Sequence, residues 1–155
     1  MRTTRPASLP YTGDAEADAL LAADPMALLI GFVLDQQVSV QKAFSGPLEL
    51  QRRLGTLDPA TIAAMDPVDL ETAFRERPAL HRFPGNMAKR SQAFCTAVAE
   101  VYGGDAARIW TEAADGPDLE RRFLALPGIG EMKAKALLAS LGRRFGVELE
   151  CLDAV

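Results

Sequence analysis

The sequence predicts an all-α fold. Alanine and leucine dominate its apolar residues, aromatic residues make up only 6%, and apolar positions recur at intervals of three and four rather than two. No segment shows the alternation of a β-strand, and no repeat has the period of a solenoid. With 155 residues, of which 48% are apolar, the chain is long enough for one domain with a core and too short for two. We therefore expect a single helical domain over residues 14–155.

A loose N-terminal arm is expected over residues 1–13, which contain Pro6, Pro10 and Gly13. After this arm, three helix starts share one signal, an aspartate followed by a proline. The aspartate can accept hydrogen bonds from the free N–H groups of a first turn, and proline suits a first position that needs no N–H. These starts are Asp24-Pro25, Asp58-Pro59 and Asp66-Pro67.

The helix over residues 25–37 is apolar on nearly all sides, so we expect it at the centre of the core. Ser39 is expected to cap the next helix, which runs toward Leu54 and carries Gly46-Pro47 as a kink. Two short helices are expected after it, over residues 59–65 and 67–76.

Four more helices are predicted in the second half of the chain. The longest covers residues 86–102 and ends at a pair of glycines, and its inward-facing residues are predicted to be Met87, Phe94, Val98 and Val101. Shorter helices are expected over residues 105–110, 118–125 and 131–145.

Composition excludes several classes of protein. The formal net charge of −4 gives no global support for nucleic-acid binding, so any such role must come from local charge. The longest apolar run, residues 25–34, is far shorter than the roughly 20 residues of a membrane span, and no secretory signal follows the first arginines, so a cytoplasmic location is expected. Two cysteines and one histidine cannot supply an iron–sulfur cluster or a zinc site, so no metal held by side chains is expected.

The most specific local feature is Leu126-Pro127-Gly128-Ile129-Gly130, which joins the last two predicted helices. Its glycines allow a tight turn and a close approach to another surface. The free N–H groups of the following helix would form a site for a phosphate, provided that the turn is exposed. Residues 119–146 contain six basic and two acidic residues, so this segment is locally positive in an acidic protein.

Here the sequence resembles a known family. The hairpin over about residues 118–145, with Ala134 in the first turn of its second helix, looks like the helix-hairpin-helix of the HhH-GPD DNA glycosylases. Residues 28–44 are similar to the family's N-terminal barrel segment, and residues 85–90 to its helix start before the hairpin. The matches follow the family's order over roughly residues 24–153, and Gln36-Gln37-Val38-Ser39 is closest to the branch that removes alkylated purines.

The resemblance implies an enzyme of base excision repair that binds double-stranded DNA, flips out a damaged base and hydrolyses its N-glycosidic bond. The carboxylate that stabilises positive charge on the sugar would be Asp153, with Glu150 as the rival if the alignment shifts by one turn. Gln37 would fill the gap left by the flipped base. The DNA contacts would come from the hairpin, and the hairpin carbonyls could hold a monovalent cation. The hairpin residues are Leu126, Gly128, Ile129, Gly130, Lys133 and Lys135.

Two departures from the family's pattern restrict which reaction and which branch of the family are expected. Met132 stands where members that also cleave the DNA backbone have a lysine, so a lyase step is not expected. The cysteines of the iron–sulfur branch are absent, so the chain would be a short member without that cluster and without a cofactor held by side chains.

Two other functions stay open: a helix-hairpin-helix protein that binds DNA without catalysis, and an all-helical adaptor that contacts protein, which the net charge favours. Among single residues, His81 is expected to have a capping or surface role, and Cys95 to lie in the core. Trp110, Phe83 and Phe123 could stack on a flipped base, but core positions are expected for them.

Overall fold

The computed structural model of the chain describes residues 6–145, and within them every regular element is an α-helix, which confirms the predicted fold class. The predicted catalytic carboxylates Asp153 and Glu150 lie outside the described residues. The helices are α1 (Ala15–Ala23), α2 (Pro25–Leu34), α3 (Val40–Leu54), α4 (Pro59–Ala64), α5 (Pro67–Arg75), α6 (Pro84–Tyr102), α7 (Arg108–Thr111), α8 (Gly116–Leu124) and α9 (Glu131–Arg144).

Helix starts are set by local capping, as the sequence predicts. The side chains of Asp24, Asp58 and Asp66 accept hydrogen bonds from N–H groups of α2, α4 and α5, each with proline in the first turn. Ser39 caps α3 in the same way. These four caps confirm the predicted helix starts.

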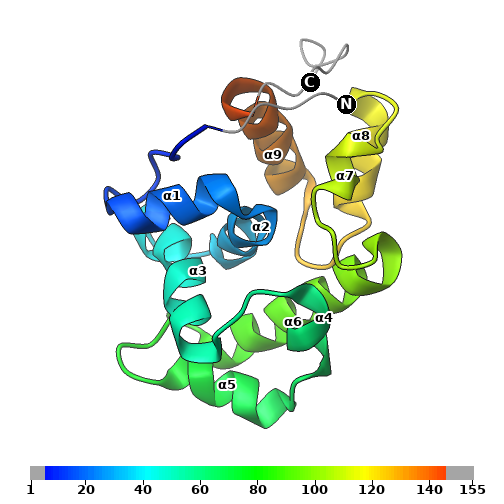
Figure 1. The fold of residues 1–155 in the computed structure, drawn as a ribbon. Helices are drawn as coiled ribbons and strands as arrows, with labels where there is room; N and C mark the ends of the chain where they lie inside the picture. The colour runs from blue at the N-terminus through cyan, green and yellow to red at the C-terminus, as the bar shows by residue number, and fades with distance from the viewer. Residues whose placement is uncertain (1–5, 146–155) are drawn as a thin grey trace.

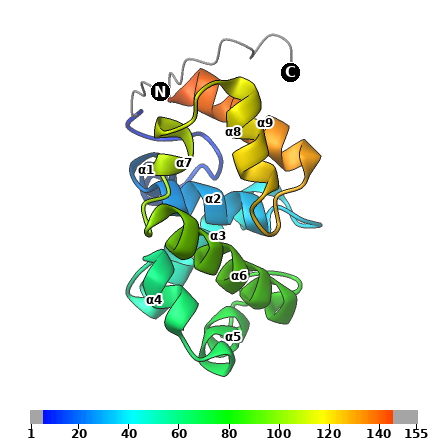
Figure 2. The same cartoon turned by 90° about the vertical axis from the view of Figure 1, so that its right-hand side faces the viewer.

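The core is built around α2, whose residues from Met26 to Leu34 are all buried. Helix α3 packs directly against it, because Gly31 faces the ring of Phe44 so closely that a Cβ at Gly31 would collide with it. At one end of the molecule α4 and α5 pack on α6, and at the other end α8 and α9 form the predicted hairpin (Figures 1 and 2). Helix α2 thus lies between the two ends (Figure 2).

The segment before α1 is packed in part against the domain. The side chain of Leu9 is fully buried, and the Tyr11 ring stacks on Phe44 with 4.4 Å between ring centroids. The carboxylate of Asp18, itself buried, accepts hydrogen bonds from Thr12 N at 2.9 Å and Gly13 N at 3.2 Å. Part of the segment predicted as a loose arm is therefore held by stacking and by hydrogen bonds.

Several helix bounds and one inward position differ from the sequence-based expectations. Helix α6 begins at Pro84 rather than at residue 86, α7 covers Arg108–Thr111 rather than residues 105–110, and α8 begins at Gly116 rather than at residue 118. Helix α2 ends at Leu34 rather than at residue 37, because Asp35 N bonds Phe32 O, Gln36 N bonds Leu34 O, and the chain turns tightly. Val101 is 65% exposed rather than buried, since Tyr102, four residues after Val98, takes the inward position.

No single described helix is long and apolar enough to cross a membrane. Helices α1 and α2 taken together are long and apolar enough for a membrane span, but a bend of 112° separates them and α2 is buried in the core.

Candidate nucleic-acid interface

The hairpin turn presents its backbone while its apolar side chains anchor it. Gly128 adopts the left-handed conformation at φ +83°, and Ile129 N donates to Leu126 O at 3.3 Å to close the turn. The side chains of Leu126 and Ile129 are buried, whereas Pro127 and Gly130 are exposed. The turn is therefore exposed, as expected, at Pro127 and Gly130. The side chains of Leu126 and Ile129 instead pack into the domain.

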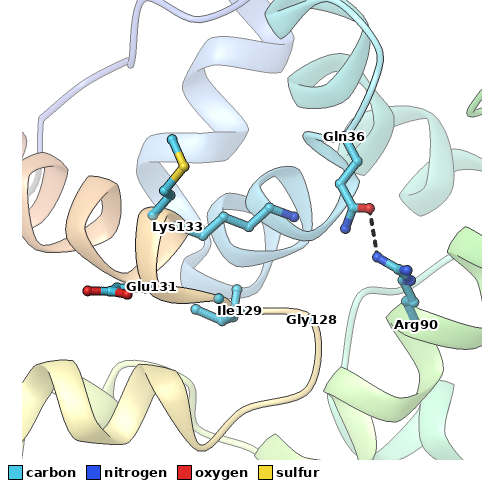
Figure 3. Close-up of a pocket in the computed structure, with 8 residues that line it drawn as sticks. Gln36, Arg90, Gly128, Ile129, Glu131 and Lys133 are labelled. Atoms are coloured by element: carbon cyan, nitrogen blue, oxygen red, sulfur yellow. Dashed lines mark hydrogen bonds between the residues drawn. The ribbon is translucent and has the colours of Figure 1, made fainter.

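Helix α9 begins immediately after this turn without a side-chain cap. Its N-cap residue is Gly130, which makes no capping hydrogen bond, so the first N–H groups of α9 are available to a ligand. A cavity of about 530 Å³ lies at this helix end, lined by residues 128–133 together with Gln36 and Arg90 (Figure 3). The helix dipole and Arg90 both make the cavity favourable for an anion such as a phosphate.

Three elements meet around this cavity, at the end of α2. The Lys133 ammonium reaches from α9 and donates from Nζ to Val33 O at 3.2 Å. Arg90 of α6 donates from Nη1 to Gln36 Oε1 at 2.6 Å (Figure 3). These contacts join the hairpin to the last turn of α2, and α6 to the segment that follows α2.

The two hairpin lysines differ in environment. Burial lowers the pKa of Lys133, the Asp35 carboxylate partly offsets this by raising it, and Arg90 adds a smaller lowering. The Lys133 side chain is half-buried and lines the cavity. Lys135 is exposed and pairs with Glu131 at 3.5 Å, one turn earlier on the same helix. Of the two, Lys133 lines the cavity and Lys135 is the more exposed.

The two glutamines after α2 also differ. Gln37 is exposed and adopts φ +56°, which makes it the one residue other than glycine with positive φ in the described part of the chain. Gln36, not Gln37, lines the cavity. Gln36 and Arg90 are the site residues that the sequence reasoning did not select, although both lie in the segments that carry the family resemblance.

Met132 occupies the expected position beside the cavity and is 86% exposed. No group of three metal-ligating side chains occurs in the described part of the chain. The carbonyls of Leu126 and Gly130 already accept hydrogen bonds from Ile129 N and Ala134 N.

A second cavity, of about 280 Å³, lies between the N-terminal segment, α2, α3 and α9, and its wall is aromatic. The Phe32 ring meets the Phe44 ring edge-on at 5.2 Å, and Tyr11 stacks on Phe44. Its polar lining includes Asp35, Ser140 and Arg143, and Ser140 Oγ is 3.0 Å from Tyr11 Oη.

The aromatic residues selected from the sequence lie elsewhere. Trp110 and Phe123 are buried in the core, as expected, and Cys95 is fully buried, where burial raises the pKa of its thiol to about 12. Phe83 is partly buried, with the Arg82 guanidinium 5.3 Å from its ring centre. His81 is buried rather than at the surface, because both of its ring nitrogens have backbone partners.

The comparison with solved structures concerns this arrangement, in which a helical hairpin packs beside the end of a buried central helix. The chain is similar to a trapped covalent intermediate of endonuclease III with DNA in an estranged-adenine complex, with a TM-score of 0.55 and 24% identity over 76% of this chain and 47% of that one. It is also similar to a non-covalent complex of endonuclease III with DNA, with a TM-score of 0.58 and 23% identity over 80% and 49%.

The chain therefore has the fold of endonuclease III and spans about half the length of these structures. No protein-family model matches the sequence, and no curated protein is similar enough to count as a match. The resemblance identified from the sequence is confirmed at the level of the fold.

Proposed function

We propose that this protein is a DNA glycosylase of base excision repair, which hydrolyses the N-glycosidic bond of a damaged base in double-stranded DNA. The observation that supports this most strongly is the uncapped start of α9, which opens into a 530 Å³ cavity beside Arg90, in a chain with the fold of endonuclease III. One DNA phosphate would accept hydrogen bonds from the N–H groups that follow Gly130, close to the Lys135 ammonium.

Hydrolysis of the N-glycosidic bond leaves positive charge on the sugar, which a fixed carboxylate stabilises. By the family resemblance this carboxylate is Asp153, with Glu150 as the rival, and water is the nucleophile. In the duplex the damaged nucleotide would turn out of the stack, and Gln37 would enter the space that it leaves. The exposure of Gln37 next to the cavity-lining Gln36 is compatible with this role.

An alkylated purine is the proposed substrate. Alkylation of a ring nitrogen gives the base a positive charge, and aromatic rings attract cations through their negative faces. The second cavity is lined by the half-buried Tyr11 ring and the Asp35 carboxylate, with the buried Phe32 and Phe44 rings packed against Tyr11. The similarity of residues 36–39 to the alkylpurine branch favours the same substrate class.

We further propose that the reaction stops at base release. A lyase step needs a lysine amine that attacks the sugar, and Met132 occupies the family's position for it. The nearby Lys133 amine is bonded to Val33 O in the cavity wall.

A monovalent cation on the hairpin carbonyls would support phosphate binding, and DNA affinity should then be higher in potassium chloride than in tetramethylammonium chloride at equal ionic strength.

The test is release of methylated purines from alkylated duplex DNA. Asp153→Asn is expected to keep DNA binding and to lower base release by on the order of 10² or more, and Glu150→Gln to leave it unchanged. The reverse pattern would assign the role to Glu150.

Borohydride should trap no covalent adduct, because no lysine occupies position 132. A trapped adduct that is lost in Lys133→Gln would replace the hydrolytic proposal with a lyase that uses this amine. Binding without base release from any alkylated or deaminated DNA would identify a non-catalytic DNA-binding protein. Absence of salt-dependent DNA binding would favour the adaptor.

A further inference from the structure

The loop of residues 35–39, which joins α2 to α3, is surrounded by cations that form no ion pair among the described residues. Most other cations of the described residues do pair with carboxylates. The cations around the loop instead contact a backbone carbonyl, a side-chain amide or an aromatic ring. A neutral partner holds a cation in place without cancelling its charge. These cations are Lys42, Arg82, Arg90 and Lys133.

Two of the four cations belong to the side of the loop that faces the start of α6. Lys42, in the first turn of α3, donates from Nζ to Ala79 O at 2.6 Å. The Arg82 guanidinium lies 5.3 Å from the ring centre of Phe83, the N-cap residue of α6. Both Lys42 and Arg82 are exposed. Neither lines the cavity at the hairpin, so they form a separate positive surface.

This surface and the hairpin lie on opposite sides of the loop. Figure 2 shows the loop between the start of α9 and the start of α6. The contacts agree, because the end of α2 bonds Lys133 of α9 through Val33 O, and His81 of the segment before α6 through Leu34 O. The exposed Gln37 lies in the loop between the two sides.

The carboxylates of this region leave it positive. Asp35 acts on the cavity-lining lysine of α9 from within the loop and raises the pKa of that lysine. Other carboxylates close to the region already pair with cations, namely Glu49 with Arg53, Glu71 with Arg75 and Glu131 with Lys135. The four cations around the loop therefore outnumber the carboxylates that could neutralise them, in a protein with a net charge of −4.

We propose that Lys42 and Arg82 form an opposite-strand surface, which binds phosphates of the DNA strand that the hairpin does not hold. This inference rests on the proposed function, because it assumes a duplex centred on the loop that carries Gln37. The two backbones of a duplex lie on opposite sides of its base pairs. A duplex that presents one strand to the hairpin therefore presents the other to the far side of the loop. Phosphate oxygens supply the anionic partners that Lys42 and Arg82 lack within the described chain.

Binding of a labelled undamaged duplex, compared with binding of one of its strands alone, tests this assignment. Lys42→Gln and Arg82→Gln should each weaken duplex binding on the order of five- to tenfold near 0.1 M salt, and should each reduce the slope of log affinity against log salt by roughly one unit. Neither should change the affinity for the single strand, which the hairpin can hold alone. Lys135→Gln, on the hairpin helix, should weaken binding of both. Fluorescence anisotropy measures all of these affinities.

Matched variants separate charge from packing. Lys42→Arg and Arg82→Lys keep the positive charge, so their salt slopes should match that of the wild type. Arg108→Gln removes an exposed cation that pairs with Glu112 at 2.7 Å on α7, and it should leave duplex binding unchanged. Urea unfolding shows whether each variant is folded.

Two results would overturn the opposite-strand surface. Equal weakening of duplex and single-strand binding in Lys42→Gln and Arg82→Gln would assign both residues to the strand on the hairpin. Unchanged duplex binding would remove them from the interface.

These outcomes are distinct from failure of the proposed function, because an undamaged duplex requires no base release. Base release by the wild type, with unchanged salt slopes in Lys42→Gln and Arg82→Gln, would contradict the surface alone. Reduced duplex slopes in a protein that releases no base would support the surface and contradict the proposed function. A wild type that binds no duplex would overturn both.

Discussion

Arg53 is the most heavily bonded charged side chain in the described part of the chain. It is 6% exposed and donates to the carbonyls of Ala73, Glu76 and Pro78 at 2.7, 2.9 and 2.6 Å. Its Nε also donates to Glu49 at 3.2 Å. The planar guanidinium can serve these acceptors together because its donors are held in a fixed fork. Arg53 thereby ties α3 to the end of α5.

Arg53→Ala should lower the free energy of unfolding by about 1–2 kcal/mol, because it removes several hydrogen bonds of a buried guanidinium, while water can reach the exposed carbonyls of Glu76 and Pro78. The neighbouring Arg52 is the matched control, since its pair with Glu16 is more than half exposed on both sides. Arg52→Ala should therefore cost less than about 1 kcal/mol. Urea unfolding followed by circular dichroism measures both values. Similar losses in the two variants would contradict the role given to Arg53.

Ser91 presents the opposite case, a buried hydroxyl without a hydrogen-bond partner among the described residues. Its residue exposure is 1%, and it lies on the inner side of α6. Ser91→Ala should raise the free energy of unfolding by about 1 kcal/mol, because it removes an unpaired polar group from the core. Ser140→Ala is the control, since that hydroxyl bonds Tyr11 Oη and its removal should not stabilise the fold. Thermal unfolding of both variants gives the comparison.

In the hairpin turn, Gly128 is needed for the backbone conformation, whereas Gly130 lies where a ligand is proposed to bind. Gly128 has φ +83°, which a side chain tolerates poorly, so Gly128→Ala should cost about 1–2 kcal/mol of stability. Gly130 has φ −86° and nothing within 4 Å of a built Cβ. Gly130→Ala should therefore change stability by less than about 0.5 kcal/mol.

The same Gly130→Ala change should weaken DNA binding, because the added methyl group stands at the start of α9 where a phosphate is proposed to lie. Fluorescence anisotropy with a labelled duplex measures this effect. Unchanged affinity in the folded variant would remove the start of α9 from the interface.

Helix starts were predictable because each depends on residues adjacent in the chain, such as Asp24 with Pro25. The end of α2 was not, because the turn at Asp35 and Gln36 that ends it contains no glycine or proline. Side chains from far along the sequence also bond the last residues of α2. His81 bonds Leu34 across 47 positions, and Lys133 bonds Val33 across 100. Lys133 was predicted as a phosphate contact, and the sequence did not reveal that it also bonds Val33 O at the cavity that it lines. A sequence pattern shows which residues share a helix face, but not which distant carbonyl a long side chain will reach.

At the scale of the whole molecule, a net charge of −4 is compatible with the proposed DNA binding only if a locally positive part of the surface contacts the DNA. Residues 119–146 are locally positive, and the exposed Lys135 lies next to the cavity-lining turn of α9. Acidic residues gather elsewhere, as in α1 with Glu16 and Asp18. The molecule would therefore approach a duplex with the hairpin foremost.

Two charge reversals with the same effect on net charge test this orientation. Lys135→Glu places a negative charge beside the proposed phosphate, so it should weaken binding to all sequences alike. It should also reduce the slope of log affinity against log salt by roughly one unit, the value for one lost phosphate contact. Arg52→Glu changes the net charge equally but lies on α3 rather than on the hairpin helix α9 that carries Lys135. Its slope should match the wild type, because counterions are released only where the protein touches the backbone. Equal effects of the two variants would show that DNA affinity depends on the total charge of the protein. That outcome would contradict the assignment of the hairpin as the DNA-binding surface.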